Sequence, residues 1–191
     1  MKRPLIVCAV VAGVLLAGEH LAAKVKVRVD FDKTFAFNKA RTWGWSTAGA
    51  GQVIVARTPN DDPAAIKQRA EPLVMAAVNT EMPKRGLKYV EQSPDLRLTY
   101  YVLITIGTSA QTMGQFLPAV TDWGLPPFAP ATQSLEYIEK GAMALDLMGG
   151  DKIVWRGVGE AQIDLDLDQK KRAALIQEAV QKILERYPPK S

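Results

Sequence analysis

The side chains with the widest catalytic and metal-binding chemistry lie together at the start of this chain of 191 residues. The only cysteine, Cys8, and the only histidine, His20, fall in the stretch MKRPLIVCAVVAGVLLAGEHLAAKVKV. Thiolate and imidazole groups supply nucleophilic triads, zinc centres and haem ligands. Whether these two residues belong to the folded protein therefore decides which chemistry it can use.

The segment around them has the layout of a secretory signal peptide. Two basic residues come first, residues 4–17 form an uncharged and almost wholly apolar run, and small residues precede Lys24. The run is shorter than the roughly 20 residues of a transmembrane helix. We expect residues 1–23 to be a signal peptide, cleaved after Ala23, and no transmembrane span in the mature chain.

The alternatives are cleavage after Gly18 or Ala22, an uncleaved N-terminal anchor, or a buried N-terminal helix. A lipoprotein signal would place a cysteine after a small residue at the end of the apolar run, whereas Cys8 lies inside it, behind Val7. We therefore expect an exported protein, in the periplasm or associated with the outer membrane, that is not lipidated.

Cleavage would leave a mature chain, residues 24–191, with neither Cys nor His. Disulfides, Cys nucleophiles, His-based triads, and zinc or haem sites built on Cys or His would then be excluded. We expect no catalytic residues, no cofactor and no metal site, although carboxylate, Lys, Tyr or Ser/Lys chemistry stays possible. The mature chain has 22 basic and 19 acidic residues in mixed order, so we expect no nucleic-acid surface.

Two short motifs resemble functional sites but do not meet the requirements of those sites. The acidic run DLDLD at 164–168 lacks the Gly and Glu that a calcium loop needs at its positions 6 and 12. Asp168 is expected to cap a helix instead. Trp155 and Arg156 are adjacent on a predicted strand and must point to opposite faces, so one is expected in the core and the other exposed.

Alternating patterns predict strands, and helical spacing predicts two helices. Strands are predicted over 24–31, 34–46, 87–90, 96–106, 135–147 and 152–165, and residues 47–62 are predicted to be mostly loop. A helix begins after Asp62, where Pro72 should kink or split it, and a second follows Asp168. The expected fold is a single α+β domain over 24–191. It is a two-layer sandwich, with a mainly antiparallel sheet of about five or six strands and two amphipathic helices on one face.

Aromatic residues in a long loop are the candidates for partner contact. Residues 107–133 contain three Gly, four Pro and one charged residue, and a loop of this length is usually functional or disordered. Its rings, Phe116, Trp123 and Phe128, suit partner or ligand contact. The alternative is that the loop folds back and uses them as a small core of its own. Trp43 and Trp45 are expected to cover a helix rather than line a groove.

Four segments resemble, in order and spacing, the bacterial family named domain of unknown function 4136. They are TFAFNKARTWGW, PKRGLKYVEQSPDLRLTYYV, YIEKGAMALDLMGGDKIVWRG and AVQKILERYPP. The resemblance covers most of 27–189 and implies an exported envelope protein, often a lipoprotein, with an α+β fold and no established activity. This chain departs from the family in lacking a lipobox cysteine and in its Pro-rich loop.

These observations favour a non-enzymatic envelope module that binds a protein, lipid or glycan partner. The alternatives are an envelope hydrolase using carboxylates, which needs two acids converging in a cleft, or a carrier of a small apolar ligand, which needs a pocket between sheet and helices. The sequence does not set the oligomeric state.

Overall fold

The computed structural model describes residues 25–56, 62–105, 140–162 and 168–189. The strands are β1 (Lys26–Phe31), β2 (Thr42–Trp45), β3 (Gly51–Ala56), β4 (Lys88–Tyr89), β5 (Leu96–Thr105), β6 (Lys140–Gly149) and β7 (Lys152–Gln162). The α-helices are α1 (Pro63–Glu81) and α2 (Gln169–Leu184), and the short 3-10 helices are η1 (Phe37–Lys39) and η2 (Pro83–Arg85).

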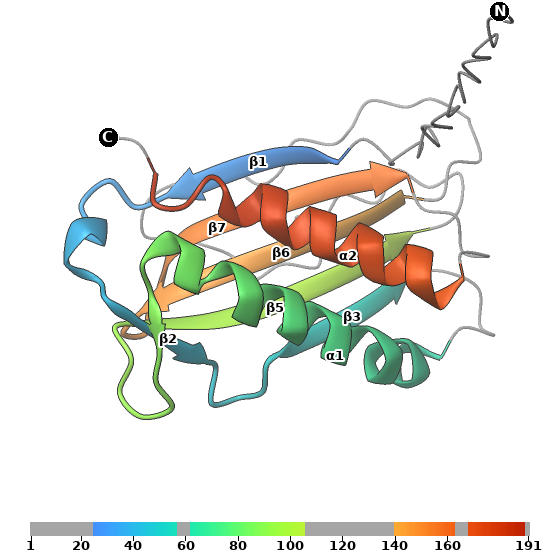
Figure 1. Cartoon of the computed structure of the whole chain (residues 1–191), viewed down its shortest axis with the longest axis horizontal. Helices are drawn as coiled ribbons and strands as arrows, with labels where there is room; N and C mark the ends of the chain where they lie inside the picture. The colour runs from blue at the N-terminus through green and yellow to red at the C-terminus, as the bar shows by residue number, and fades with distance from the viewer. Residues whose placement is uncertain (1–24, 57–61, 106–139, 163–167, 190–191) are drawn as a thin grey trace, which may run out of the picture.

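All seven strands belong to one sheet, in the order β1-β7-β6-β5-β2-β4, with β3 also paired to β5 (Figure 1). β2 pairs with the first residues of β5 and β3 with the rest, so these two strands follow each other along one edge of β5. The pairs β1–β7, β7–β6 and β6–β5 are antiparallel. The pairs β5–β2, β5–β3 and β2–β4 are parallel, because α1 carries the chain back between β3 and β5.

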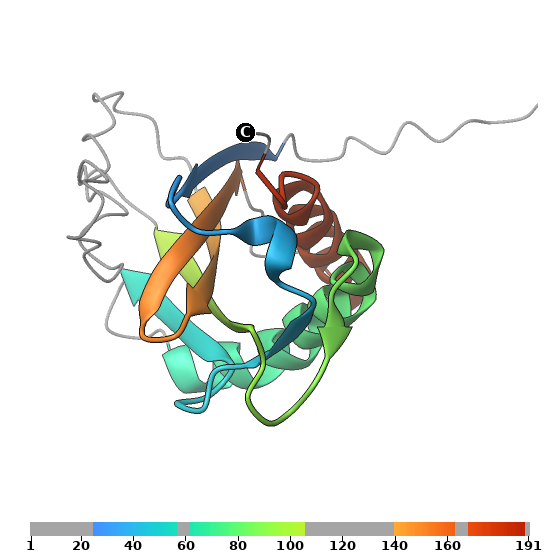
Figure 2. The ribbon, with the colours of Figure 1, turned by 90° about the vertical axis from the view of Figure 1, so that its left-hand side faces the viewer.

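Both α-helices lie on the same face of the sheet (Figure 2). The expected α+β class is therefore confirmed, and the sheet is larger and more mixed than the sequence pattern indicates. Periodicity predicts a loop over 47–62, which is wrong for residues 51–56, because β5 supplies the ladder partner that makes them a strand.

Helix α1 does not split at Pro72 but runs from Pro63 to Glu81. A proline inside a helix costs about 3 kcal/mol. Burial offsets this cost, since the next turns place Val74 and Val78 in the core with no exposed surface, at roughly 1.5–3 kcal/mol for each side chain.

The main core fills the space between the sheet and the two helices. Leu96, Leu98 and Tyr100 alternate along β5 toward the helices and have no exposed surface. Gly157 of β7 faces α2 at a point where only a glycine fits, because a Cβ there would collide with the Ile183 side chain. This close contact fixes the distance between α2 and the sheet.

Candidate functional site

The three rings expected to contact a partner, Phe116, Trp123 and Phe128, lie outside the described residues, as does the expected cleavage position after Ala23. The structure does fix the two positions between which the rings are inserted. Thr105 at the end of β5 and Lys140 at the start of β6 are register partners in the antiparallel pair. Residues 106–139, called the β5–β6 segment below, therefore leave and re-enter the sheet at adjacent positions on two neighbouring strands.

The sheet face turned away from α1 and α2, called the outer face below, carries a buried ion pair. Asp146 of β6 and Arg156 of β7 are register partners. Arg156 Nε donates a hydrogen bond to Asp146 Oδ1, and Nη2 donates one to Oδ2, each over 2.6 Å. Asp146 is 0% exposed and Arg156 3% exposed. Two parallel bonds of this kind hold the guanidinium and the carboxylate rigidly in one plane.

Burial of Arg156 corrects one expectation from the sequence. Trp155 lies in the core and Arg156 on the outer face, as strand alternation requires. The expectation that one of them is exposed is wrong, because both faces of β7 are buried at this point. Burial raises the pKa of Asp146, and the hydrogen bonds and charge of Arg156 act in the opposite direction. Each charge makes the burial of the other tolerable.

Apolar side chains surround this pair on the outer face. Leu103, Ala144 and Val158 form a separate cluster, and each is at most 3% exposed. Tyr101 packs against the cluster; burial raises its pKa, and the nearby charge of Asp146 adds to the effect. The middle of the sheet therefore has an interior-like environment on both faces.

Two acids on α1 also have structural partners. Glu81 is 1% exposed and accepts a hydrogen bond from Lys84 Nζ over 2.7 Å, while Arg85 lies 3.6 Å from its other oxygen. Glu71 accepts a hydrogen bond from the Tyr100 hydroxyl over 2.8 Å, and burial is the main cause that raises the pKa of Tyr100. Each carboxylate thus joins two parts of the fold.

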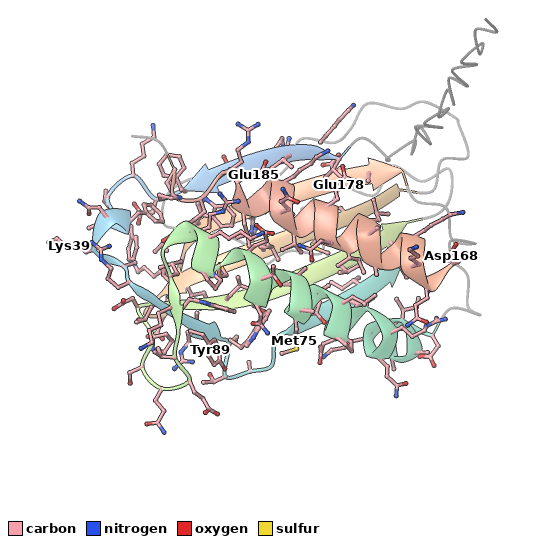
Figure 3. All side chains as sticks on the ribbon, viewed as in Figure 1. Lys39, Met75, Tyr89, Asp168, Glu178 and Glu185 are labelled. Atoms are coloured by element: carbon pink, nitrogen blue, oxygen red, sulfur yellow. The ribbon has the colours of Figure 1, made fainter. Side chains whose placement is uncertain are left out.

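Trp43 of β2 belongs to the core, and Trp45 packs against it. Trp43 is 1% exposed, and its ring meets that of Trp45 edge to face at 5.4 Å, as expected for rings that pack rather than line a groove. Tyr89 of β4 stacks edge to face on Trp43 at 5.3 Å. Within the described ranges Tyr89 is the one large hydrophobic side chain that stays exposed, at 48% (Figure 3).

One residue of the acidic run, Asp168, lies within the described ranges. Asp168 caps α2 as expected, accepting a hydrogen bond from the Lys171 amide over 2.8 Å, while residues 163–167 lie outside the described ranges. In the part of the chain that the structure describes, no cluster of three or more His, Cys, Asp or Glu residues could hold a metal ion. None of the helices described here is long and apolar enough to cross a membrane.

Sequence reasoning missed the pair of Asp146 and Arg156, although a signal for it was present. Asp146 is the only charged residue in the run GAMALDLMG, and Arg156 lies across the glycine turn from it. The exact register depends on an irregularity between Leu147 and Met148, which periodicity does not predict.

Comparisons with known proteins gave one family match and several similar solved structures. The sequence model described as Domain of unknown function (DUF4136) matches residues 27–189. The crystal structure of a DUF4136 family protein from Bacteroides thetaiotaomicron VPI-5482 has 16% identity and a TM-score of 0.47, covering 86% of this chain and 96% of that one. A PDZ domain protein from Parabacteroides distasonis ATCC 8503 has 10% identity and a TM-score of 0.49, covering 89% and 38%. A PelC dodecamer from Paraburkholderia phytofirmans has 8% identity and a TM-score of 0.39, covering 88% and 100%. No curated protein matches the chain.

Proposed function

The chain belongs to the DUF4136 family, whose sequence model spans residues 27–189, and from this premise we propose that it is an exported cell-envelope protein that binds a partner rather than catalysing a reaction. The partner is an envelope protein, lipid or glycan, and the β5–β6 segment makes the contact through Phe116, Trp123 and Phe128. The family membership agrees with the resemblance seen in the sequence.

One observation carries this proposal, namely where the β5–β6 segment is inserted. Thr105 and Lys140 are register partners, so a turn of two residues would join β5 to β6. The chain instead inserts residues 106–139. Connections longer than about 12–15 residues within a compact domain are uncommon and are usually functional or disordered. Binding residues are concentrated in loops that a rigid scaffold positions.

The scaffold on either side of the insertion supports a binding role. β5 and β6 are central strands of the sheet, and side chains of both are buried on the core face and on the outer face. The ion pair between Asp146 and Arg156 ties β6 to β7 six residues along β6 from Lys140. Strands held in this way give the segment fixed ends, which lowers the entropy that partner binding must overcome.

The positions of the acids favour binding over carboxylate catalysis. A hydrolase of that class needs two acids that converge, one of them with a raised pKa. Asp146, whose pKa burial raises, lies on the outer face and is bonded through both oxygens to Arg156. Glu81, also buried, lies on α1, on the opposite side of the sheet, and is paired with Lys84. Each buried acid thus already neutralises a basic side chain.

Photocrosslinking in native cells tests the partner contact. The photoreactive amino acid p-benzoylphenylalanine would replace Phe116, Trp123 or Phe128 in turn, and Tyr89 in the control, because Tyr89 is an exposed ring outside the segment. We expect adducts of defined mass from the segment positions and none from position 89. Equal adducts from all four positions, or none from any, would refute a partner site in the segment.

Export needs a separate measurement, because nothing in the fold depends on it. Cells would be fractionated, and the N-terminal sequence and intact mass of the native protein determined. We expect a soluble envelope species that starts at or near Lys24, without Cys8 and His20. A full-length species starting at Met1 would refute cleavage and return both residues to the functional protein.

A further inference from the structure

Strand β1 forms one end of the sheet, and within the described residues no strand pairs with its other edge, called the β1 edge below (Figure 1). The strand pairs with β7 over all six of its residues, without a bulge or a proline. Proteins usually protect such an edge by shortening the strand, by a bulge or a proline, or by charged side chains. β1 has only the last of these, so the arrangement of its charges decides what the β1 edge can bind.

Backbone geometry determines which residues face the β1 edge. The amide of Asp32 donates a hydrogen bond to the carbonyl of Val154 in β7 over 2.9 Å. Successive residues of a strand direct their N–H and C=O groups to opposite sides, so the even-numbered residues of β1 bond to β7. Val27, Val29 and Phe31 therefore direct theirs out of the β1 edge. The side chains of these three pack against the core, while the charged side chains of β1 stand on the outer face.

The charges of β1 exclude most ways of pairing it with a second copy of the chain. Two copies related by a two-fold axis pair antiparallel, and because outward residues must face outward residues to hydrogen-bond, one residue lies opposite itself at the axis. An axis at any of the three charged residues of β1 brings two like charges face to face, which destabilises a strand pair. An axis at Val27 or Phe31 also places two basic or two acidic residues opposite each other. Within β1 only an axis at Val29 avoids this.

We propose that the β1 edge is the docking surface for a second copy of this chain, paired antiparallel about a two-fold axis at Val29. In this register Arg28 of each copy lies opposite Asp30 of the other, and Lys26 lies opposite Asp32. These are non-hydrogen-bonded pairs, in which side chains are closest, so opposite charges there stabilise the pairing. The outward-facing residues make the backbone hydrogen bonds. The charges thus select one register and disfavour the others.

The apolar side of the same pairing extends the core. Val29 lies opposite Val29 and Val27 opposite Phe31, on the face that carries the helices. These side chains are only partly buried within one copy, so a second copy covers apolar surface that otherwise contacts water. Pairing therefore removes apolar surface from water on one face and neutralises charges on the other.

Helix α2 leaves room for the second copy. A Cβ at Gly157 or Gly159 would meet the Ile183 side chain, so α2 lies over β7 rather than over β1. Three strand spacings of about 4.8 Å separate β7 from its counterpart in the second copy. The two α2 helices therefore lie about 14 Å apart, beyond the distance of about 8–10 Å at which helices pack directly.

This inference goes beyond the proposed function, because its surface lies on β1 and its partner is a second copy. The β5–β6 segment takes no part in it. Association of the purified chain can therefore fail while the crosslinking experiment in cells succeeds, and the reverse.

Charge exchange tests the register. Arg28→Asp leaves two acidic residues opposite each other, and Asp30→Arg leaves two basic residues opposite each other. The two-fold axis repeats each contact, so we expect the dissociation constant of the dimer to rise at least about 10-fold in each variant. Analytical ultracentrifugation of the full chain measures this constant. Lys88→Asp, an exposed charge reversal on β4 at the opposite end of the sheet, is the control and should leave it unchanged.

An equimolar mixture of the two charge variants is the decisive sample. One chain then carries two acids and the other two basic residues at positions 28 and 30, so opposite charges face each other again at both contacts. We expect the mixture to form a heterodimer about as tightly as the unchanged chain forms its dimer. Loss of a fold, checked by thermal melting of each variant, would not produce this recovery.

A cysteine scan, in a chain with Cys8→Ser, tests the position of the axis and decides the matter if the charge variants do not fold. At position 29 the two Cα atoms lie about 5.5 Å apart, within the range of about 4.4–6.8 Å that a disulfide bridges. At position 28 they lie about 8 Å apart, which is too far. Mild oxidation should link Val29→Cys chains into covalent dimers at least about 10-fold faster than Arg28→Cys chains or, as the exposed control, Tyr89→Cys chains.

Four results would overturn the proposal. The first is a chain that sediments as a monomer at every concentration. The second is a mixture of the two charge variants that associates no better than either variant alone. The third is covalent dimers that form no faster from Val29→Cys than from Arg28→Cys or Tyr89→Cys. The fourth is association that is lost in a chain beginning at Lys24, which would assign the contact to the N-terminal residues instead of β1.

Discussion

Removing one member of the buried ion pair should destabilise the protein strongly. Arg156→Met leaves Asp146, which is 0% exposed, without the two hydrogen bonds that compensate its burial. Breaking a buried pair in this way costs about 3–5 kcal/mol. For a chain of this size each kcal/mol lowers Tm by about 2–4 °C, so the expected loss is about 6–20 °C. Urea unfolding followed by circular dichroism would give the free energy directly.

A matched control separates burial from pairing. Lys182 Nζ lies 2.6 Å from Glu178 Oε1, the same separation as in the buried pair, but the two side chains are 38% and 27% exposed. Lys182→Met should therefore cost only about 0.3–0.5 kcal/mol. Equal losses from Arg156→Met and Lys182→Met would show that water reaches the outer face and would refute the reasoning.

The double variant Asp146→Leu with Arg156→Met tests the cause of the loss. Two apolar side chains leave no charge buried, and such replacements are often neutral or stabilising by about 1–4 kcal/mol. We expect the double variant to be far more stable than Arg156→Met alone. If the double variant instead loses as much stability as the two single variants together, the loss comes from packing rather than from an unpaired charge.

Two further substitutions and one titration have defined outcomes. Gly157→Ala should lower Tm, because the added methyl group meets Ile183; an unchanged melting curve would show that α2 shifts freely. Tyr187→Phe should be neutral or raise the unfolding free energy by about 1 kcal/mol at pH 7, since the buried hydroxyl has no hydrogen-bond partner. Burial raises the pKa of Tyr187 to about 12, so its contribution to the free energy of unfolding is present below pH 10 and lost as pH rises toward 12. In urea unfolding between pH 8 and 11.5, the free energy of unfolding should therefore fall less steeply with pH in Tyr187→Phe than in the unchanged protein. Hydrogen bonds from the Arg41 amide and from Thr42 lower the pKa of Asp95. Its contribution to the free energy of unfolding is therefore present above the ordinary pKa and lost as pH falls through the pKa of the folded state. An NMR titration that places the pKa of Asp95 at or above the ordinary value would contradict this.

Local patterns were reliable wherever a segment's own residues determine its structure. The alternation over 24–31 and 96–106 predicted β1 and β5, with the expected face in the core. Asp62 and Asp168 cap helices because their carboxylates accept hydrogen bonds from backbone amides two or three residues ahead. The order of several such segments was also enough to identify the family.

Contacts between distant residues decided what those patterns left open. Residues 51–56 form β3 only because β5, some fifty residues later, pairs with them. Pro72 stays inside α1 because the helix buries Val74 and Val78 against the sheet.

The ion pair between Asp146 and Arg156 shows most clearly what the sequence determines and what the tertiary structure decides. The sequence alone determined that Trp155 and Arg156 point to opposite faces, because the period of a strand is fixed by backbone geometry. Tertiary structure alone decided that the second face is buried too, and that Asp146 lies within 2.6 Å of Arg156. Burial depends on what packs above a residue, and that is a property of the whole chain rather than of its local pattern.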